Sequence, residues 1–236
     1  MENLHEFTER INSFQTDSVP DEPTFGLPPS LAEKIAPQTG MLQPFHGDTV
    51  AYFLDDDAQK LIGSLAKDLH THFGESLSVP LPVEMAHVTL HDLHASPNRE
   101  LVWPSMQSGL AIATELVARA RAIGPIRTRC TAVFNLVNTS VVVGITADDE
   151  AEHRKLLQAR ALFEEIVPSE RFTPHITLAY YRPHTLTPLQ PREFRKALGR
   201  MTELVSGKPI VLTPERLHLL HFDSMGNYWA VQPSIP

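Results

Sequence analysis

The chain has 236 residues, 42% of them apolar and 20% charged, which is typical of a globular protein that can bury a large core. The net charge of −8 excludes a nonspecific grip on long nucleic acid, because counterion release needs a basic surface. A single cysteine, Cys130, excludes an internal disulfide framework, and the absence of an apolar run of about 18 residues argues against membrane association.

Residues 1–46 predict an N-terminal arm. They contain six prolines, and Leu4, Phe7, Ile11 and Phe14 form one apolar stripe at helical spacing. We expect this arm to pack on its own chain; a contact between copies is the alternative, although we expect a monomer. The first six residues have neither the basic start nor the apolar stretch of a secretory signal, so a cytoplasmic location is expected.

A regular domain is predicted over residues 47–236. Its first half, about 47–137, contains in order a strand at 49–54, a helix capped by Asp55, a strand at 85–93, a helix at 105–123 and a strand at 127–136. The second half, about 138–236, contains a strand at 141–145, a helix capped by Asp148, a strand at 172–181, a helix from Pro191, a strand at 209–220 and a hairpin into 228–231.

The order of elements is therefore duplicated. Each half contains strand, helix, strand, helix and strand, and adjacent strands are expected to pair, 127–136 with 140–146 and 209–221 with 228–233. This predicts an α+β fold in which two β/α lobes, with mostly antiparallel sheets, are related by a pseudo-two-fold axis and enclose a central cleft.

One tetrapeptide occurs in each half. His87-Val88-Thr89-Leu90 and His175-Ile176-Thr177-Leu178 both lie in runs that predict strands. Residues two apart on a strand share a face, so each tetrapeptide offers an imidazole beside a hydroxyl, while Val88 and Ile176 point into a core. The same alternation predicts that His91 and Tyr181 also line the cleft.

Two imidazoles and two hydroxyls suit acid–base chemistry on an anionic centre such as a phosphodiester. Histidine is the side chain that titrates near neutral pH, so one neutral and one protonated copy coexist there. Two equivalent strands brought together across a shared cleft would supply both copies at once. The sequence does not indicate which histidine is the base and which is the acid.

Paired His-x-Thr-x tetrapeptides on a duplicated β/α scaffold resemble the two-histidine (2H) phosphoesterase superfamily, which includes cyclic phosphodiesterases and the so-called 2′,5′ RNA ligases. The resemblance covers about residue 48 to the C-terminus and is strongest at 86–90 and 174–178. It implies hydrolysis of a phosphodiester, often a 2′,3′-cyclic phosphate, without metal or cofactor. It also implies that His87 and His175 transfer protons and that Thr89 and Thr177 hold the phosphate. The substrate would be a small nucleotide or an RNA end.

Two other functions remain open. His87, His91 and His94, with Asp92 between them, resemble a set of metal ligands, and on a helix His87 and His91 would share a face. Val88 and Thr89 favour a strand instead, and the glutamate that follows the first histidine of a zinc hydrolase motif is absent. A nucleotide-binding module without turnover would keep the cleft, but binding alone needs no pair of titrating groups.

Overall fold

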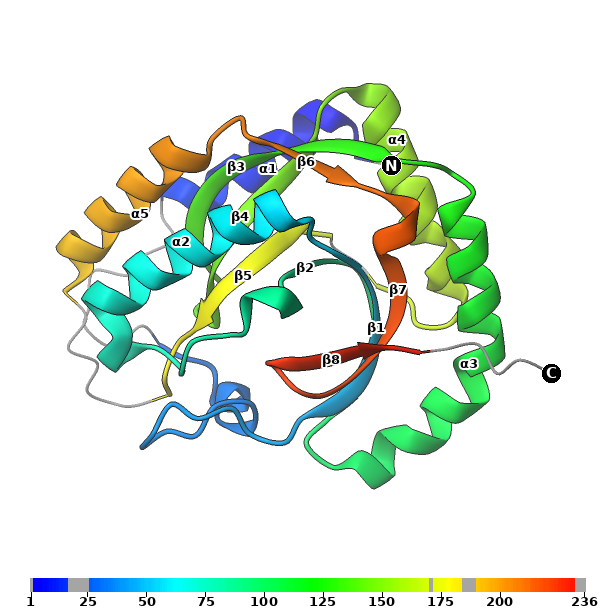
Figure 1. Ribbon diagram of the computed structural model, residues 1–236, viewed down its shortest axis with the longest axis horizontal. Helices are drawn as coiled ribbons and strands as arrows, with labels where there is room; N and C mark the ends of the chain where they lie inside the picture. The colour runs from blue at the N-terminus through cyan, green and yellow to red at the C-terminus, as the bar shows by residue number, and fades with distance from the viewer. Residues whose placement is uncertain (1, 17–25, 170–171, 184–189, 232–236) are drawn as a thin grey trace.

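The computed structural model describes residues 2–16, 26–169, 172–183 and 190–231 (Figure 1). This part of the chain forms two four-stranded sheets in which every pairing is antiparallel, with strand orders β2-β1-β7-β8 and β5-β4-β3-β6. The strands are β1 (His46–Phe53), β2 (His87–Ser96), β3 (Ile126–Leu136), β4 (Ser140–Ala147), β5 (His175–Tyr180), β6 (Pro209–Leu212), β7 (Leu217–Ser224) and β8 (Asn227–Ala230). The predicted α+β architecture with antiparallel sheets is confirmed.

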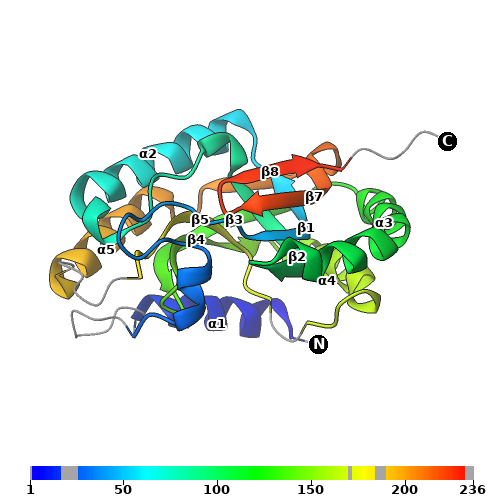
Figure 2. The ribbon, with the colours of Figure 1, turned by 90° about the horizontal axis from the view of Figure 1, so that it is seen from below.

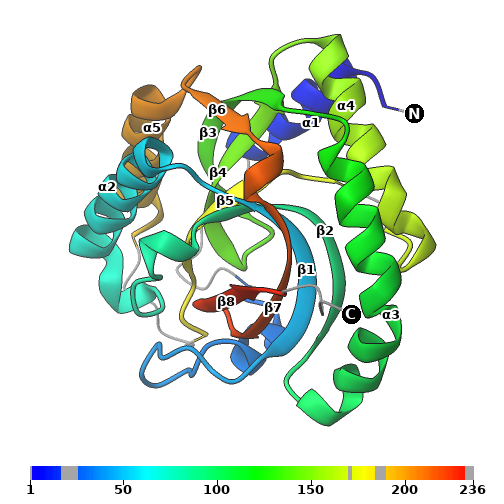
Figure 3. The ribbon, with the colours of Figure 1, turned by 45° about the vertical axis from the view of Figure 1, so that its right-hand side comes forward.

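Five α-helices surround the sheets in the described residues. They are α1 (Leu4–Thr16), α2 (Asp56–Phe73), α3 (Arg99–Arg121), α4 (Glu150–Ala161) and α5 (Pro191–Val205). In Figure 1, α2 and α5 lie on one side of the molecule and α3 and α4 on the other; Figure 3 shows α3 running along the sheet of β1 and β2. None of the described helices has the length and hydropathy that crossing a bilayer requires.

The two sheets do not coincide with the predicted halves, about 47–137 and 138–236. The first sheet takes β1 and β2 from the first half of the sequence but β7 and β8 from the second, while β3 crosses to the second sheet. The reason is local: β3 and β4 form a hairpin whose turn residues Val137 and Asn138 have φ of 42° and 58°. Strands joined by so short a turn pair with each other, so both must belong to one sheet.

The single strand predicted at 209–220 is wrong. It is two strands, β6 and β7, separated by a 3₁₀ turn at Pro214–Arg216. Pro214 has no backbone N–H to donate to a neighbouring strand, so β6 ends before it. On one side of this turn β6 pairs with β3, and on the other side β7 pairs with β1 and β8.

The N-terminal arm packs on the body of the chain, as predicted. Phe7 and Ile11 of α1 are fully buried against Phe134 and Val142 of the second sheet. Figure 2 shows α1 on the side of the sheets opposite α2. Because α1 covers this outer face, β4 is buried along its whole length on both faces, which explains its apolar run over residues 141–145.

The N-terminal caps of two helices agree with the sequence expectations to within one residue. Asp55 caps α2 as predicted, its carboxylate accepting from the amide of Ala58. The cap of α4 is Asp149 rather than Asp148; its carboxylate accepts from the amides of Ala151 and Glu152. Either aspartate satisfies the same sequence rule, so only the backbone geometry selects between them.

Candidate active site

The two tetrapeptides meet at one cavity. Strands β2 and β5 are the edge strands of their sheets, and they contact each other. A cavity of about 360 Å³ lies over them, and His87, Thr89, His175 and Thr177 all line it. The intervening residues Val88 and Ile176 are at most 1% exposed and point into the main core, as the alternation predicted.

The two histidines are held in the same way. Nδ1 of His87 lies 2.7 Å from the carbonyl oxygen of Met85, and Nδ1 of His175 lies 2.7 Å from the carbonyl oxygen of Thr173. A carbonyl can only accept, so Nδ1 carries the proton and donates in both rings. The other nitrogen, Nε2, is therefore left as the atom that gains or loses a proton in each imidazole.

Alternation along β2 is interrupted by a bulge directly after Thr89. Thr89 pairs with Ala51 and His91 with Val50, so Leu90 is the extra residue, and Leu90 and His91 are both fully buried. The expectation that His91 lines the cleft is wrong for this reason. Its Nδ1 donates to the carbonyl of Asp92, and its Nε2 lies 3.4 Å from Glu164 Oε1.

The same interruption occurs on β5. Thr177 pairs with Val142 and Ala179 with Val141, so Leu178 is the extra residue. The expectation that Tyr181 lines the cleft is therefore wrong as well: Tyr181 is fully buried, its ring 6.2 Å from that of Phe194. The bulges bring Asp92 and Tyr180 to the cavity instead. No sequence signal marks a bulge at a leucine, so alternation alone missed both residues.

The geometry does not support a shared metal site for His87 and His91. They lie on opposite faces of β2, one lining the cavity and the other in the core. His94 lines the cavity, but its Nδ1 lies 2.9 Å from Asp48 Oδ1. Within the described residues, no three side chains of the metal-binding types converge on one point.

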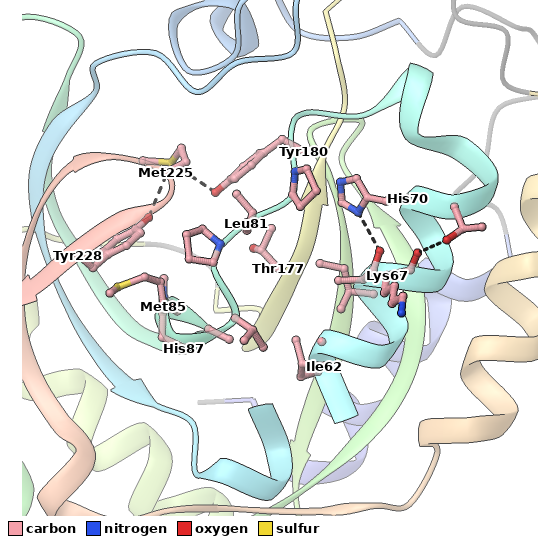
Figure 4. A pocket seen from close by; sticks show the side chains of 18 residues that line it. Ile62, Lys67, His70, Leu81, Met85, His87, Thr177, Tyr180, Met225 and Tyr228 are labelled. Carbon is pink, nitrogen blue, oxygen red and sulfur yellow. Dashed lines mark hydrogen bonds between the residues drawn. The ribbon is translucent and has the colours of Figure 1, made fainter. Parts of the chain in front are cut away.

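A second, larger cavity adjoins the first. It measures about 560 Å³ and shares five lining residues with the first, His87, Thr177, Tyr180, Met225 and Tyr228. Its far wall is formed by α2 and by the segment before β2 (Figure 4), which contribute mainly apolar side chains, among them Ile62, Leu81 and Met85.

A tyrosine–methionine cluster separates the two cavities. The hydroxyls of Tyr180 and Tyr228 both point to the sulfur of Met225, at 3.3 Å and 3.8 Å (Figure 4). The Tyr228 ring packs on the imidazole of His87, with 4.6 Å between the ring centroids. Burial raises the pKa of Tyr180 to about 12, so its hydroxyl remains a hydrogen-bond donor at neutral pH.

Burial lowers the pKa of both cleft histidines, because a partly desolvated imidazole resists protonation. The carbonyl hydrogen bonds and the carboxylate of Asp92 oppose this effect at both residues. The pKa of His87 is lowered further by the charge of His175.

Comparison with solved structures identifies the fold. The crystal structure of ATU0111, a conserved protein of unknown function from Agrobacterium tumefaciens, is 15% identical and superposes with a TM-score of 0.60 over 90% of this chain and 93% of that chain. The apo structure of Escherichia coli LigT is also 15% identical, with a TM-score of 0.50 over 80% of this chain and 95% of that chain. No family model and no curated protein sequence matches the chain. The chain thus shares its fold with ATU0111 and LigT.

Proposed function

We propose that the protein is a phosphodiesterase that hydrolyses a nucleotide or RNA-end phosphodiester, such as a 2′,3′-cyclic phosphate, without a metal ion. The observation that carries this proposal is the matched pair of histidines. Both line one cavity, and both have Nδ1 fixed by a carbonyl two residues earlier, which leaves Nε2 for proton transfer. Two such groups are what hydrolysis of a phosphodiester requires at neutral pH.

His87 is the base and His175 the acid in this proposal. The neutral imidazole of His87 removes a proton from water as the water oxygen attacks phosphorus. The imidazolium of His175 gives its proton to the ester oxygen as the P–O bond breaks. We assign the roles in this order because the charge of His175 is one of the causes that lower the pKa of His87.

Thr89 and Thr177 bind the non-bridging oxygens of the phosphate. Each hydroxyl lies two residues after a histidine on the same strand face and lines the same cavity. A neutral donor stabilises negative charge that grows on these oxygens in the transition state, and it does not compete for the protons that the histidines move. Tyr180, whose hydroxyl stays protonated, is a further donor at this position.

The adjoining cavity binds the organic part of the substrate. Its volume of about 560 Å³ and its mainly apolar walls suit a group of nucleoside size, and it opens directly beside His87 and Thr177. His91 and Tyr181 have no substrate contact in this proposal, because both are buried.

The test is a turnover assay on 2′,3′-cyclic nucleotides and on linear 2′,5′ and 3′,5′ dinucleotides, each with and without a chelator. Wild-type protein should hydrolyse at least one of them equally well with chelator. The control variant is His72→Ala, since His72 is an exposed histidine on α2, paired with Asp68. Binding of a nucleotide without any turnover would favour the non-catalytic module, and loss of turnover with chelator would favour a metal-dependent hydrolase.

A further inference from the structure

The N-terminal arm contributes a cation to the cavity that holds the tetrapeptides. Lys34 follows a 3₁₀ turn at Pro29–Glu33 and lines the same cavity as His87 and His175. Its side chain is partly buried, and burial lowers the pKa of its ammonium group. A segment outside the duplicated β/α elements thus adds a cation to the cavity that the four tetrapeptide side chains line.

The ammonium group of Lys34 lies over an aromatic ring. Nζ lies 4.7 Å from the centroid of the Phe45 ring, which also lines the cavity. Across the described ranges, this ammonium makes no side-chain hydrogen bond or ion pair. Asp92 and Glu33 act on it only at longer range. A cation that has lost part of its water shell without gaining an acceptor is unfavourable, and an anion in the cavity would correct this.

The backbone around Lys34 is fixed to the body of the chain. Its carbonyl accepts from the amide of Gln43 at 2.8 Å, and the neighbouring residue Ile35 forms a β-bridge with Leu42. Two more contacts tie this loop to the segments that precede β2 and follow β5: Val79 N donates to Gly40 O at 2.8 Å, and Arg182 Nε donates to Pro37 O at 3.0 Å. Gly40 has a φ of 72°, which glycine adopts without strain. The cation is therefore held at the cavity before any ligand arrives.

We propose that Lys34 binds a phosphate oxygen of the substrate, so that the N-terminal arm is part of the substrate site. This inference rests on the proposed function for the nature of the substrate. Whatever the rest of the substrate is, the cavity over the tetrapeptides binds a phosphate group, and the Lys34 ammonium contacts that phosphate. The Thr hydroxyls and His175 would contact the other oxygens of the group.

The test measures the dissociation constant of inorganic phosphate at fixed ionic strength, by calorimetry and by the shifts of the histidine ring signals in NMR. Lys34→Met keeps the length of the side chain and removes the charge, and should weaken phosphate binding about 10- to 100-fold, the usual effect of losing a charged hydrogen bond. Lys34→Arg should restore most of the loss. Lys60→Met is the matched control, because Lys60 lies on the exposed face of α2 and pairs with Asp57; it should leave the constant unchanged.

The possible results separate this inference from the proposed function. Wild-type affinity in Lys34→Met, no phosphate binding by the wild-type protein, or equal weakening by Lys34→Arg and Lys34→Met would each overturn it. Thermal unfolding of each variant shows whether weaker phosphate binding comes from displacement of the arm. Lys34→Arg separates the two causes, because it keeps both the charge and the aliphatic part of the side chain. If phosphate binding depends on Lys34 but no diester is hydrolysed, the proposed function fails and this inference stands.

Discussion

Strands β2 and β5 are near copies up to the leucine of the tetrapeptide and differ after it. Both anchor Nδ1 of the histidine on the carbonyl two residues earlier, and both bulge at the leucine. Beyond the bulge, β2 presents the carboxylate of Asp92 to the cavity and β5 presents the phenol of Tyr180. The two strands thus place the same side chains, a histidine and a threonine, at the cavity before the bulge. After the bulge they place different ones, Asp92 and Tyr180.

The surroundings of the two histidines differ as well. The ring of Tyr228 packs on His87, and the charge of His175 lowers the pKa of His87. Two residues with the same local geometry therefore have different neighbours. A duplicated site of this kind can assign opposite roles to equivalent side chains, because small differences in the environment are enough to shift a proton from one to the other.

The largest expected effect tests what the two strands share. His87→Ala and His175→Ala should each lower kcat by at least about 10², since each removes a proton-transfer group. His72→Ala should leave kcat unchanged. Circular dichroism and thermal unfolding should show that both cleft variants fold. Near wild-type turnover in either variant, on the best substrate, would contradict the two-histidine mechanism.

The hydroxyls of the two strands should give the next largest effect. Thr89→Val and Thr177→Val each remove one donor while keeping the shape of the side chain. Each should cost about 2–4 kcal/mol of transition-state stabilisation, measured from kcat/KM, by analogy with the loss of an oxyanion donor. If neither variant changes kcat/KM, these threonines do not contact the phosphate.

The pH dependence tests the difference between the strands. Activity should fall at low pH as His87 becomes protonated and at high pH as His175 loses its proton. Burial lowers the pKa of both, so the bell for kcat/KM should centre below about 6.5, the ordinary imidazole value. The limbs of kcat should lie at higher pH, because bound phosphate favours the protonated forms. A flat kcat/KM profile from about pH 5 to 9, with chemistry shown to limit the rate, would exclude proton transfer by these residues.

The same pKa shifts affect stability. The unfolded chain, with ordinary imidazoles, binds more protons than the folded chain, so protonation favours unfolding. The melting temperature should therefore fall as the pH is lowered from about 6.5, and it should fall less steeply in His87→Ala. An equal slope in the variant would indicate that the pKa of His87 is not lowered by folding.

The smallest expected effect is a difference in pH profile between variants of Asp92 and Tyr180, the cavity residues after the two bulges. Asp92 raises the pKa of both histidines, so Asp92→Asn should shift the kcat/KM bell to lower pH by less than about one unit. Tyr180→Phe should leave the position of the bell unchanged, because burial raises the Tyr180 pKa to about 12 and the phenol carries no charge. A shift of the same size in both variants would mean that the charge of Asp92 is not its cause.

Sequence periodicity predicted the cavity-lining residues only as far as the bulges. The inward positions of Val88 and Ile176 follow from alternation and are confirmed. His91 and Tyr181 lie beyond the bulges at Leu90 and Leu178, where one extra residue reverses the facing of the side chains that follow. Bulges depend on contacts with the neighbouring strand, which no local pattern contains.

Pairing between strands that are far apart in the chain could not be predicted from the sequence either. The β3–β4 hairpin was predicted because its turn is local. The joining of β7 to β1 was not, since nothing near residue 217 encodes a partner some 170 positions earlier. The position of Lys34 at the cavity was missed for the same reason, because it depends on contacts of Pro37 and Gly40 with Arg182 and Val79, which are distant in the sequence.

The exchange of strands between the two halves has a consequence for biosynthesis. Strand β1 lies between β2 and β7, and Gly47 pairs with Phe222, so the first sheet is incomplete until residues 217–230 leave the ribosome. The nascent N-terminal half therefore exposes one edge of β1 throughout elongation, and pairing across so long a loop is slow. Neither half should be separable as an independent folding unit, and truncation before residue 217 should release a chain that chaperones and proteases recognise as unfinished.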